Sequence, residues 1–99
     1  MKCRKLAAAL AVLLIASSAA AFTGSQYLKQ AKIEPAAARK LALKAYPGVI
    51  VDEELEQESG GSGLRYSFVI RHDAAKHEVG IDAKTGEVLE NSVEGAHSD

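Results

Sequence analysis

The stretch from Ile81 to Glu90 reads IDAKTGEVLE, and it decides how the second half of this chain folds. An alternating apolar run ends at Ile81, small and polar residues follow, and apolar residues resume at Val88. A three-residue hairpin loop commonly joins a type I turn to a glycine in the left-handed conformation. With the Lys-Thr-Gly of residues 84–86 in that loop, Ile81 lies opposite Leu89. The stretch therefore predicts a β-hairpin whose apolar face continues from one strand to the next.

The same residues could be read as an enzyme motif, and their context argues against this. Asp82 is expected to turn its carboxylate toward the turn amides, Thr85 lies inside the loop, and Gly86 suits a positive φ. Penicillin-binding enzymes also carry Lys-Thr-Gly, but no serine here has a lysine three residues later, as their nucleophile motif requires. The Asp-Lys-Thr-Gly motif of phosphorylated pumps fails because Ala83 separates Asp82 from Lys84. We interpret the segment as a structural turn and predict no catalytic residues.

Two further apolar runs upstream predict more strands of the same sheet. The four expected strands are Val49 to Glu58, Leu64 to Arg71, Lys76 to Asp82, and Glu87 to about Val93. A turn at residues 73–76 would join the second strand to the third. In that register the cross-strand pairs are Ile70 with Val79, Phe68 with Ile81, and Arg71 with Glu78. These pairs match apolar with apolar and positive with negative side chains.

A single helix is predicted by the sequence IEPAAARKLALKAYPG at residues 33–48. Pro35 suits the first helical position, and Pro47-Gly48 ends the pattern. The face expected to pack on the sheet recurs every four residues: Ile33, Ala37, Leu41 and Ala45. The predicted fold class is therefore α+β, with one helix packed on an antiparallel sheet of three to four strands. Such packing leaves little volume for a drug-sized cavity, so we expect binding by a surface.

The first 21 residues have the pattern of a signal peptide. A basic start precedes ten apolar residues, Leu6 to Ile15, and Ala19-Ala20-Ala21 offers a cleavage site before Phe22. The apolar run is shorter than the ~20 residues that a membrane-spanning helix needs. We therefore predict a periplasmic or secreted protein with no membrane span after cleavage. Cleavage would also remove Cys3, the one cysteine, so no disulfide is expected.

The mature chain is expected to be a small acidic domain. Residues 22–32 form a polar lead-in with Tyr27 and Leu28 as possible packing points, residues 33–93 form the domain, and residues 94–99 form a flexible tail. Three of the 12 basic residues lie in the leader, which leaves 9 basic against 13 acidic residues, a net charge of −4. This balance argues against nucleic acid as a partner.

Two groups of side chains are candidates for binding. Asp52, Glu53, Glu54 and Glu56 concentrate negative charge on the first strand, where they could dock a partner or protect a sheet edge from aggregation. Calcium is not supported, because the run lacks the spaced ligands of an EF-hand loop. His72 and His77 become neighbours in the register given above and are weak metal candidates, since a closed zinc site needs four ligands. No cofactor is expected.

Taken in order, these segments resemble a PepSY domain. The resemblance spans roughly residues 33–90 and is carried by IEPAAARKLALKAYPG, VIVDEELEQE, LRYSFVI and VGIDAKTGEVLE. It implies a helix packed across an antiparallel sheet, with no catalytic residues. It also implies a protein-binding module, since PepSY domains occur in propeptides of thermolysin-like secreted metalloproteases. The expected function is binding or inhibition of an extracytoplasmic protease in trans. The alternative is a periplasmic ligand-binding or sensor module that partners a membrane protein.

Overall fold

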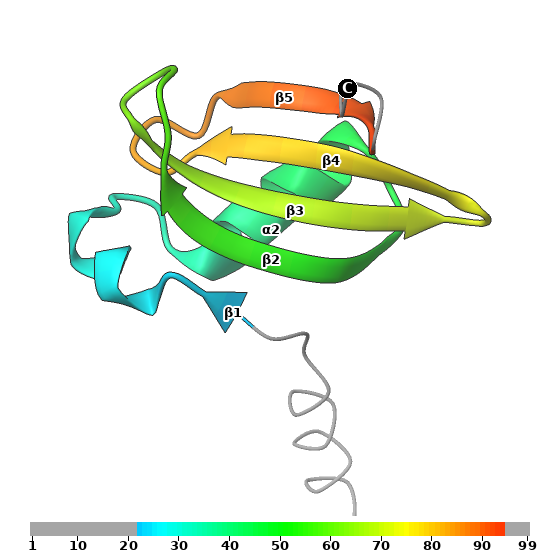
Figure 1. The fold of residues 1–99 in the computed structure, drawn as a ribbon, viewed down its shortest axis with the longest axis horizontal. Helices are drawn as coiled ribbons and strands as arrows, with labels where there is room; N and C mark the ends of the chain where they lie inside the picture. Colours follow the sequence, from blue (N-terminus) through cyan, green and yellow to red (C-terminus); the bar gives the residue numbers. More distant parts are fainter. Residues whose placement is uncertain (1–21, 95–99) are drawn as a thin grey trace, which may run out of the picture.

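One helix lies across one face of a twisted five-stranded sheet, and within residues 22–94 the other face carries no helix (Figure 1). The computed structural model describes residues 22–94. Its elements are β1 (Phe22–Thr23), the 3-10 helix η1 (Ser25–Gln30), α2 (Pro35–Ala45), β2 (Val49–Gln57), β3 (Leu64–His72), β4 (Ala75–Asp82) and β5 (Val88–Val93). The predicted leader and residues 95–99 of the predicted tail lie outside the described residues, whereas Glu94 is held by a hydrogen bond from its amide to the Lys76 carbonyl. Between residues 22 and 94, no helix is long and apolar enough to cross a membrane.

The strand order is β1-β2-β3-β4-β5, so the sheet has five strands instead of the three to four predicted. The additional strand is β1, which pairs in parallel with β2 through Phe22 with Glu53 and Thr23 with Glu54. The prediction treated residues 22–32 as a polar lead-in. Phe22 packs against the core and anchors the short strand beside β2. The other four strands begin and end within one residue of the expected positions.

Helix α2 follows its sequence signals at both ends, but it buries a different face. Pro35 is the first helical residue, and the backbone turns away at Tyr46, just before Pro47. Ala38 and Ala42 are completely buried, whereas Ala37 is exposed, so the predicted face was wrong at that position. The predicted face counts from Ile33, but Ile33 lies before the helix and therefore does not follow its periodicity. Two alanines at the contact let the helix approach the sheet closely.

The β3–β4 hairpin has the predicted buried face and the wrong register. Phe68 pairs with Val79 instead of Ile81, and Ile81 pairs with Tyr66. The loop contains only Asp73 and Ala74, and Asp73 has the positive φ of 58° that a two-residue turn requires at its first position. The shift of two residues keeps every side chain on its expected face, because side chains alternate with a period of two.

The β4–β5 hairpin has the predicted register along most of its length. Gly80 pairs with Glu90, as expected, but a bulge then places Ile81 opposite Val88 instead of Leu89. The bulge lies close to the turn, and beyond it the Asp82 amide donates a hydrogen bond to the Glu87 carbonyl at 2.8 Å. Leu89 lies half-buried outside the main core as a result.

The core lies between α2 and the sheet. Its largest members are aromatic: Tyr66 and Phe68 stack with their ring centroids 6.2 Å apart, and both are essentially inaccessible to solvent. Tyr27 packs against this core from η1, whereas Leu28 stays 37% exposed and is not a strong packing point. The remaining core is aliphatic: Ala38, Ala42, Leu55, Leu64, Ile70, Val79, Ile81 and Ala83.

Candidate binding surfaces

The turn that follows β4 is organised around the buried carboxylate of Asp82. One oxygen, Oδ1, accepts hydrogen bonds from the amides of Lys84 at 2.8 Å and Thr85 at 3.0 Å, and from the Ser62 hydroxyl at 2.8 Å. The other oxygen, Oδ2, accepts the Ser62 amide at 2.6 Å. Asp82 therefore holds its own turn and also ties it to the glycine-rich loop between β2 and β3.

The hydrogen bonds explain how a carboxylate can remain charged in the interior. Burial by itself would raise the pKa of Asp82. The donors from Ser62, Lys84 and Thr85 outweigh burial and lower the pKa to about 2. The loop approaches so closely that a Cβ at Gly61 would collide with the carboxylate.

Gly86 lies in the same turn with a φ of 83°, a region that favours glycine. A Cβ at this position would be 3.0 Å from the Ile33 Cδ1 atom, so the turn also packs against the segment before α2. Thr85 accepts the Glu87 amide on its hydroxyl at 3.2 Å. All three turn residues singled out in the sequence thus have structural contacts within this hairpin.

The acidic residues of β2 do not form one continuous surface. Glu53 faces the helix, is 3% exposed, and accepts a 2.9 Å hydrogen bond from Arg39 of α2. It had been grouped with its acidic neighbours as part of a partner edge, and that grouping was wrong because side chains alternate along a strand. Glu53 instead fastens the helix to the sheet.

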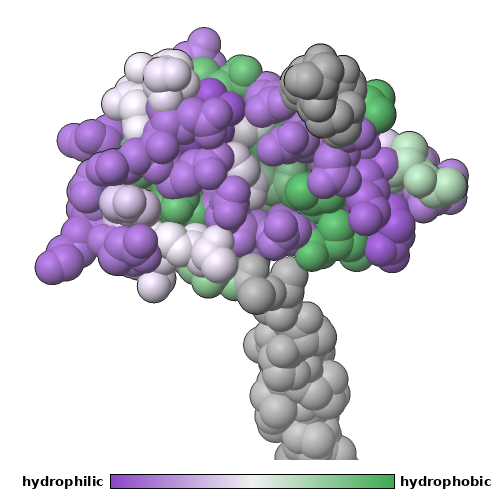
Figure 2. Space-filling model, viewed as in Figure 1, coloured by the Kyte–Doolittle hydropathy of each residue, from purple (hydrophilic) through white to green (hydrophobic). Residues whose placement is uncertain are grey.

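Asp52, Glu54 and Glu56 point to the other face of the sheet, which the helix leaves open. Asp52 is exposed. Glu54 accepts from the Thr23 hydroxyl at 3.3 Å, and Glu56 accepts from the Ser67 hydroxyl at 2.8 Å. Figure 2 views this open face and shows a mainly hydrophilic surface interrupted by hydrophobic patches. The open face, with its acidic row along β2, is the broadest candidate surface for a partner.

The two histidines lie at the opposite end of the molecule, beside the C-terminus of α2. They are not cross-strand partners, since His72 pairs with Ala75 and His77 pairs with Ile70. The ring of Tyr46 stacks on His77 with centroids 3.7 Å apart and meets His72 edge-on at 6.1 Å. Within the described range, no group of three or more metal-binding side chains occurs.

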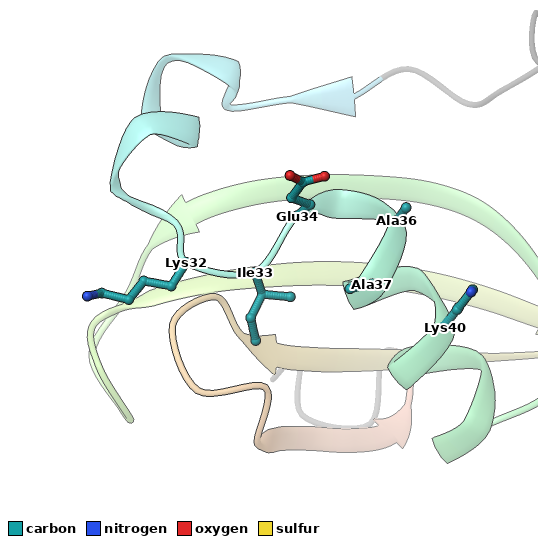
Figure 3. A pocket seen from close by; sticks show the side chains of 6 residues that line it. All are labelled: Lys32, Ile33, Glu34, Ala36, Ala37 and Lys40. Atoms are coloured by element: carbon teal, nitrogen blue, oxygen red, sulfur yellow. The ribbon is translucent and has the colours of Figure 1, made fainter.

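Next to the start of α2 the surface is hollowed, by about 480 Å³. Figure 3 shows Lys32 and Lys40 at opposite ends of this hollow, with Ile33, Ala36 and Ala37 between them. The prediction that little room would remain for a drug-sized cavity considered only the space between helix and sheet. It overlooked the exposed side of the helix, where alanines leave room.

Several residues that shape these surfaces were not identified from the sequence. Ser62, the second partner of Asp82, lies in a run of serines and glycines that predicts only a flexible loop. The side chain of Arg65 extends from β3 across β4, passing over Gly80, which has no side chain to obstruct it. It forms an ion pair with Glu90 of β5 at 3.3 Å. Asn91 is hydrogen-bonded to His77 at 2.9 Å and donates to the Ala45 carbonyl at the end of α2. Such long-range partners carry no local sequence signal.

Comparison with known families agrees with this architecture. Residues 32–91 match the model of the PepSY family, described as the peptidase propeptide and YPEB domain. The matched segment includes α2 and reaches into β5. No curated protein and no solved structure matched the chain.

Proposed function

We propose that this chain, which belongs to the PepSY family, is an exported, non-enzymatic module that binds and inhibits an extracytoplasmic protease. The family description names peptidase propeptides, and this is the observation that carries the proposal. The leader-like residues 1–21 support export to the periplasm or the exterior. Glu53, Arg65 and Asp82 are engaged in contacts that hold the fold together, which supports a binding role over a catalytic one.

The open face of the sheet is the surface proposed to meet the protease. Its acidic row, formed by Asp52, Glu54 and Glu56, would attract a basic patch on the partner. Charges on such a face are screened over about 8 Å at physiological ionic strength. Binding should therefore weaken as salt is added.

A titration against a purified thermolysin-like metalloprotease from the same organism tests this proposal. Hydrolysis of a peptide substrate should slow and saturate as the domain is added. The variant carrying Asp52→Asn, Glu54→Gln and Glu56→Gln should inhibit more weakly, and its inhibition should lose most of its salt dependence.

A matched control removes three acidic charges elsewhere, through Glu34→Gln, Glu87→Gln and Glu94→Gln. These residues are exposed and lie off the β2 row. The control should inhibit like the wild type. The absence of any inhibition or binding would refute the protease proposal, and equal losses in both triple variants would refute the role of the β2 row.

The hollow beside α2 favours a second candidate, a ligand-binding or sensor module that works with a membrane protein. Its volume of about 480 Å³ lies within the ~300–1,000 Å³ typical of small-molecule sites. Enlarging a side chain that lines it, as in Ala37→Leu, would narrow the hollow and block part of it. A ligand that stabilises the wild type against heat should then fail to stabilise the variant, whereas protease inhibition should not change.

A further inference from the structure

The two edges of the sheet differ in how far they are already covered. At the β2 edge, β1 pairs with Glu53 and Glu54, and Gly24 packs directly on the Leu55 backbone. At the other edge lies β5, and within residues 22–94 no strand pairs with its outer side (Figure 1). An uncovered strand edge is a template for pairing with another strand.

The residues of β5 provide few of the features that usually block such pairing. Its sequence, VLENSV, contains one charged residue and no proline. Val88 and Val93 at its two ends are 45% and 54% exposed. The single charge, Glu90, is directed to the open face, where it pairs with Arg65.

The ladder between β4 and β5 identifies which backbone groups of β5 point outward. The Glu94 amide donates to the Lys76 carbonyl at 2.9 Å, which marks that position as hydrogen-bonded to β4. Hydrogen-bonded positions alternate along an antiparallel pair, so Ser92 also directs its amide and carbonyl toward β4. Asn91 and Val93 therefore direct theirs away from the sheet.

We propose that β5 pairs with β5 of a second copy, antiparallel and about a twofold axis at Asn91, to form a symmetric dimer with a continuous sheet. In this register Leu89 lies opposite Val93 of the second copy, and Val88 lies opposite its Glu94. Glu90 lies opposite Ser92. In this register no pair of opposite residues brings two like charges together.

Neighbouring registers are less favourable because they oppose like charges. An axis at Glu90 places that carboxylate opposite its own symmetry mate. An axis at Ser92 places Glu90 opposite Glu94, twice. Like charges directly opposite each other destabilise a strand pair. The charge pattern of residues 88–94 therefore selects the axis at Asn91.

The dimer should be weak, and it does not depend on the proposed protease binding. Pairing through one six-residue strand buries less surface than the ~1,200 Å² at the lower limit of stable interfaces. Association should therefore be reversible and visible only as the concentration rises. A closed twofold pair also covers the β5 edge, which limits open-ended aggregation.

Sedimentation of the form that begins at Phe22, from micromolar to millimolar concentration, tests the proposal. Wild type should move from monomer to dimer. The Val93→Pro variant removes an outward amide without removing a bond to β4, and it should remain monomeric. Val93→Thr keeps the amide and should still dimerise. A wild type that is monomeric throughout would overturn the proposal, as would a dimer that persists in Val93→Pro.

A pair of charge variants tests the register on an exposed site. Val88→Lys would face Glu94 of the second copy and should strengthen the dimer, whereas Val88→Glu should weaken it. Two contacts per dimer should make the dissociation constants of the two variants differ by about tenfold. In the same samples, the amides of Asn91 and Val93 should gain protection from hydrogen exchange as concentration rises. Equal dissociation constants, or unchanged protection of these amides, would contradict the axis at Asn91.

Discussion

The two ends of the sheet are built differently. At the anchored end, the β2–β3 loop, the β4–β5 turn and the segment before α2 meet one another. At the hairpin tip, Asp73 and Ala74 join β3 to β4 and extend into solvent (Figure 1). Asp82 lies at the first end and is 1% exposed, whereas the Asp73 side chain at the tip is 92% exposed.

The anchored end is held by bonds that connect segments distant in the sequence. The amides of Lys32 and Ile33 both donate to the Ala83 carbonyl, at 2.9 and 3.0 Å. The Tyr66 hydroxyl donates to the Ile33 carbonyl at 2.7 Å, and burial raises the pKa of this tyrosine. Strand β3, the turn after β4 and the approach to α2 are therefore fixed against one another at this end.

The comparison shows where local sequence determines a turn and where it does not. The turn at residues 82–87 has a side chain that accepts its amides and a glycine at its positive φ, so its sequence specifies its geometry. The tip, Asp73-Ala74, lacks the Asn-Gly or Asp-Gly signature of two-residue turns. Its true register even places Arg71 opposite Lys76, a pairing of like charges that the sequence pattern argues against.

The largest effect is expected in the core shared by both ends. Phe68 is 1% exposed, so Phe68→Ala should lower the free energy of unfolding by about 3–5 kcal/mol. A loss of that size could unfold so small a domain. Urea denaturation followed by circular dichroism measures it, with Val88→Ala on the exposed edge as the control. A loss below about 1 kcal/mol would mean that Phe68 is not part of a packed core.

A smaller effect is expected at the anchored end from Gly86→Val. The positive φ of 83° strains any β-branched residue, and the side chain would also press on Ile33 and Leu41. The expected cost is about 1–3 kcal/mol, the range for strained backbone positions. Lys84→Ala, in the same turn but exposed, should change the melting temperature little. An unchanged melting temperature for Gly86→Val would show that the turn adapts, and the contrast between the two ends would weaken.

The charge of Asp82 should make the anchored end sensitive to acid. Its pKa falls from an ordinary 3.8 to about 2 on folding, so the charged form stabilises the fold above pH 3.8. This contribution, about 2 kcal/mol, is lost as the pH falls through about 2. Asp82→Asn should therefore be less stable than wild type at neutral pH, and the difference should shrink in acid. Asp73→Asn, at the exposed tip, is the control and should leave the stability at neutral pH almost unchanged. A loss equal to that of Asp82→Asn would contradict the role of Asp82.

The smallest effect is expected at the tip itself. Asp73→Gly relieves a positive φ of 58° but increases the entropy of the unfolded chain. These terms are each of order 1 kcal/mol and oppose each other, so stability should change by less than about 0.5 kcal/mol. A loss as large as that of Gly86→Val would remove the distinction between the two ends.

The fold was largely predictable because its elements have local signals. Pro35 and Pro47 delimit the helix, and alternating apolar residues delimit four strands. The fifth strand was missed because β1 has only two residues, too few for a periodic pattern. The exposed position of Ala37 was missed because an alanine-rich helix shows little difference between its faces.

The candidate surfaces were less predictable, because they depend on contacts between distant residues. The sequence indicated that Asp82 would cap its turn, but not that Ser62 would reach it from a loop 20 residues away. It marked Glu53 as part of an acidic row, although strand alternation and Arg39 place that carboxylate inside. The hollow beside α2 arises from alanines that look like core residues in the sequence.

Amide hydrogen exchange at the two ends tests the central claim most directly. In wild type the amides of Ser62, Lys84 and Thr85, all bonded to Asp82, should exchange slowly. In Asp82→Asn these three amides should exchange much faster, while the amide of Ala75 at the tip should keep its rate. Equal acceleration at both ends, or no change in the three amides, would contradict the account that one buried carboxylate holds the anchored end together.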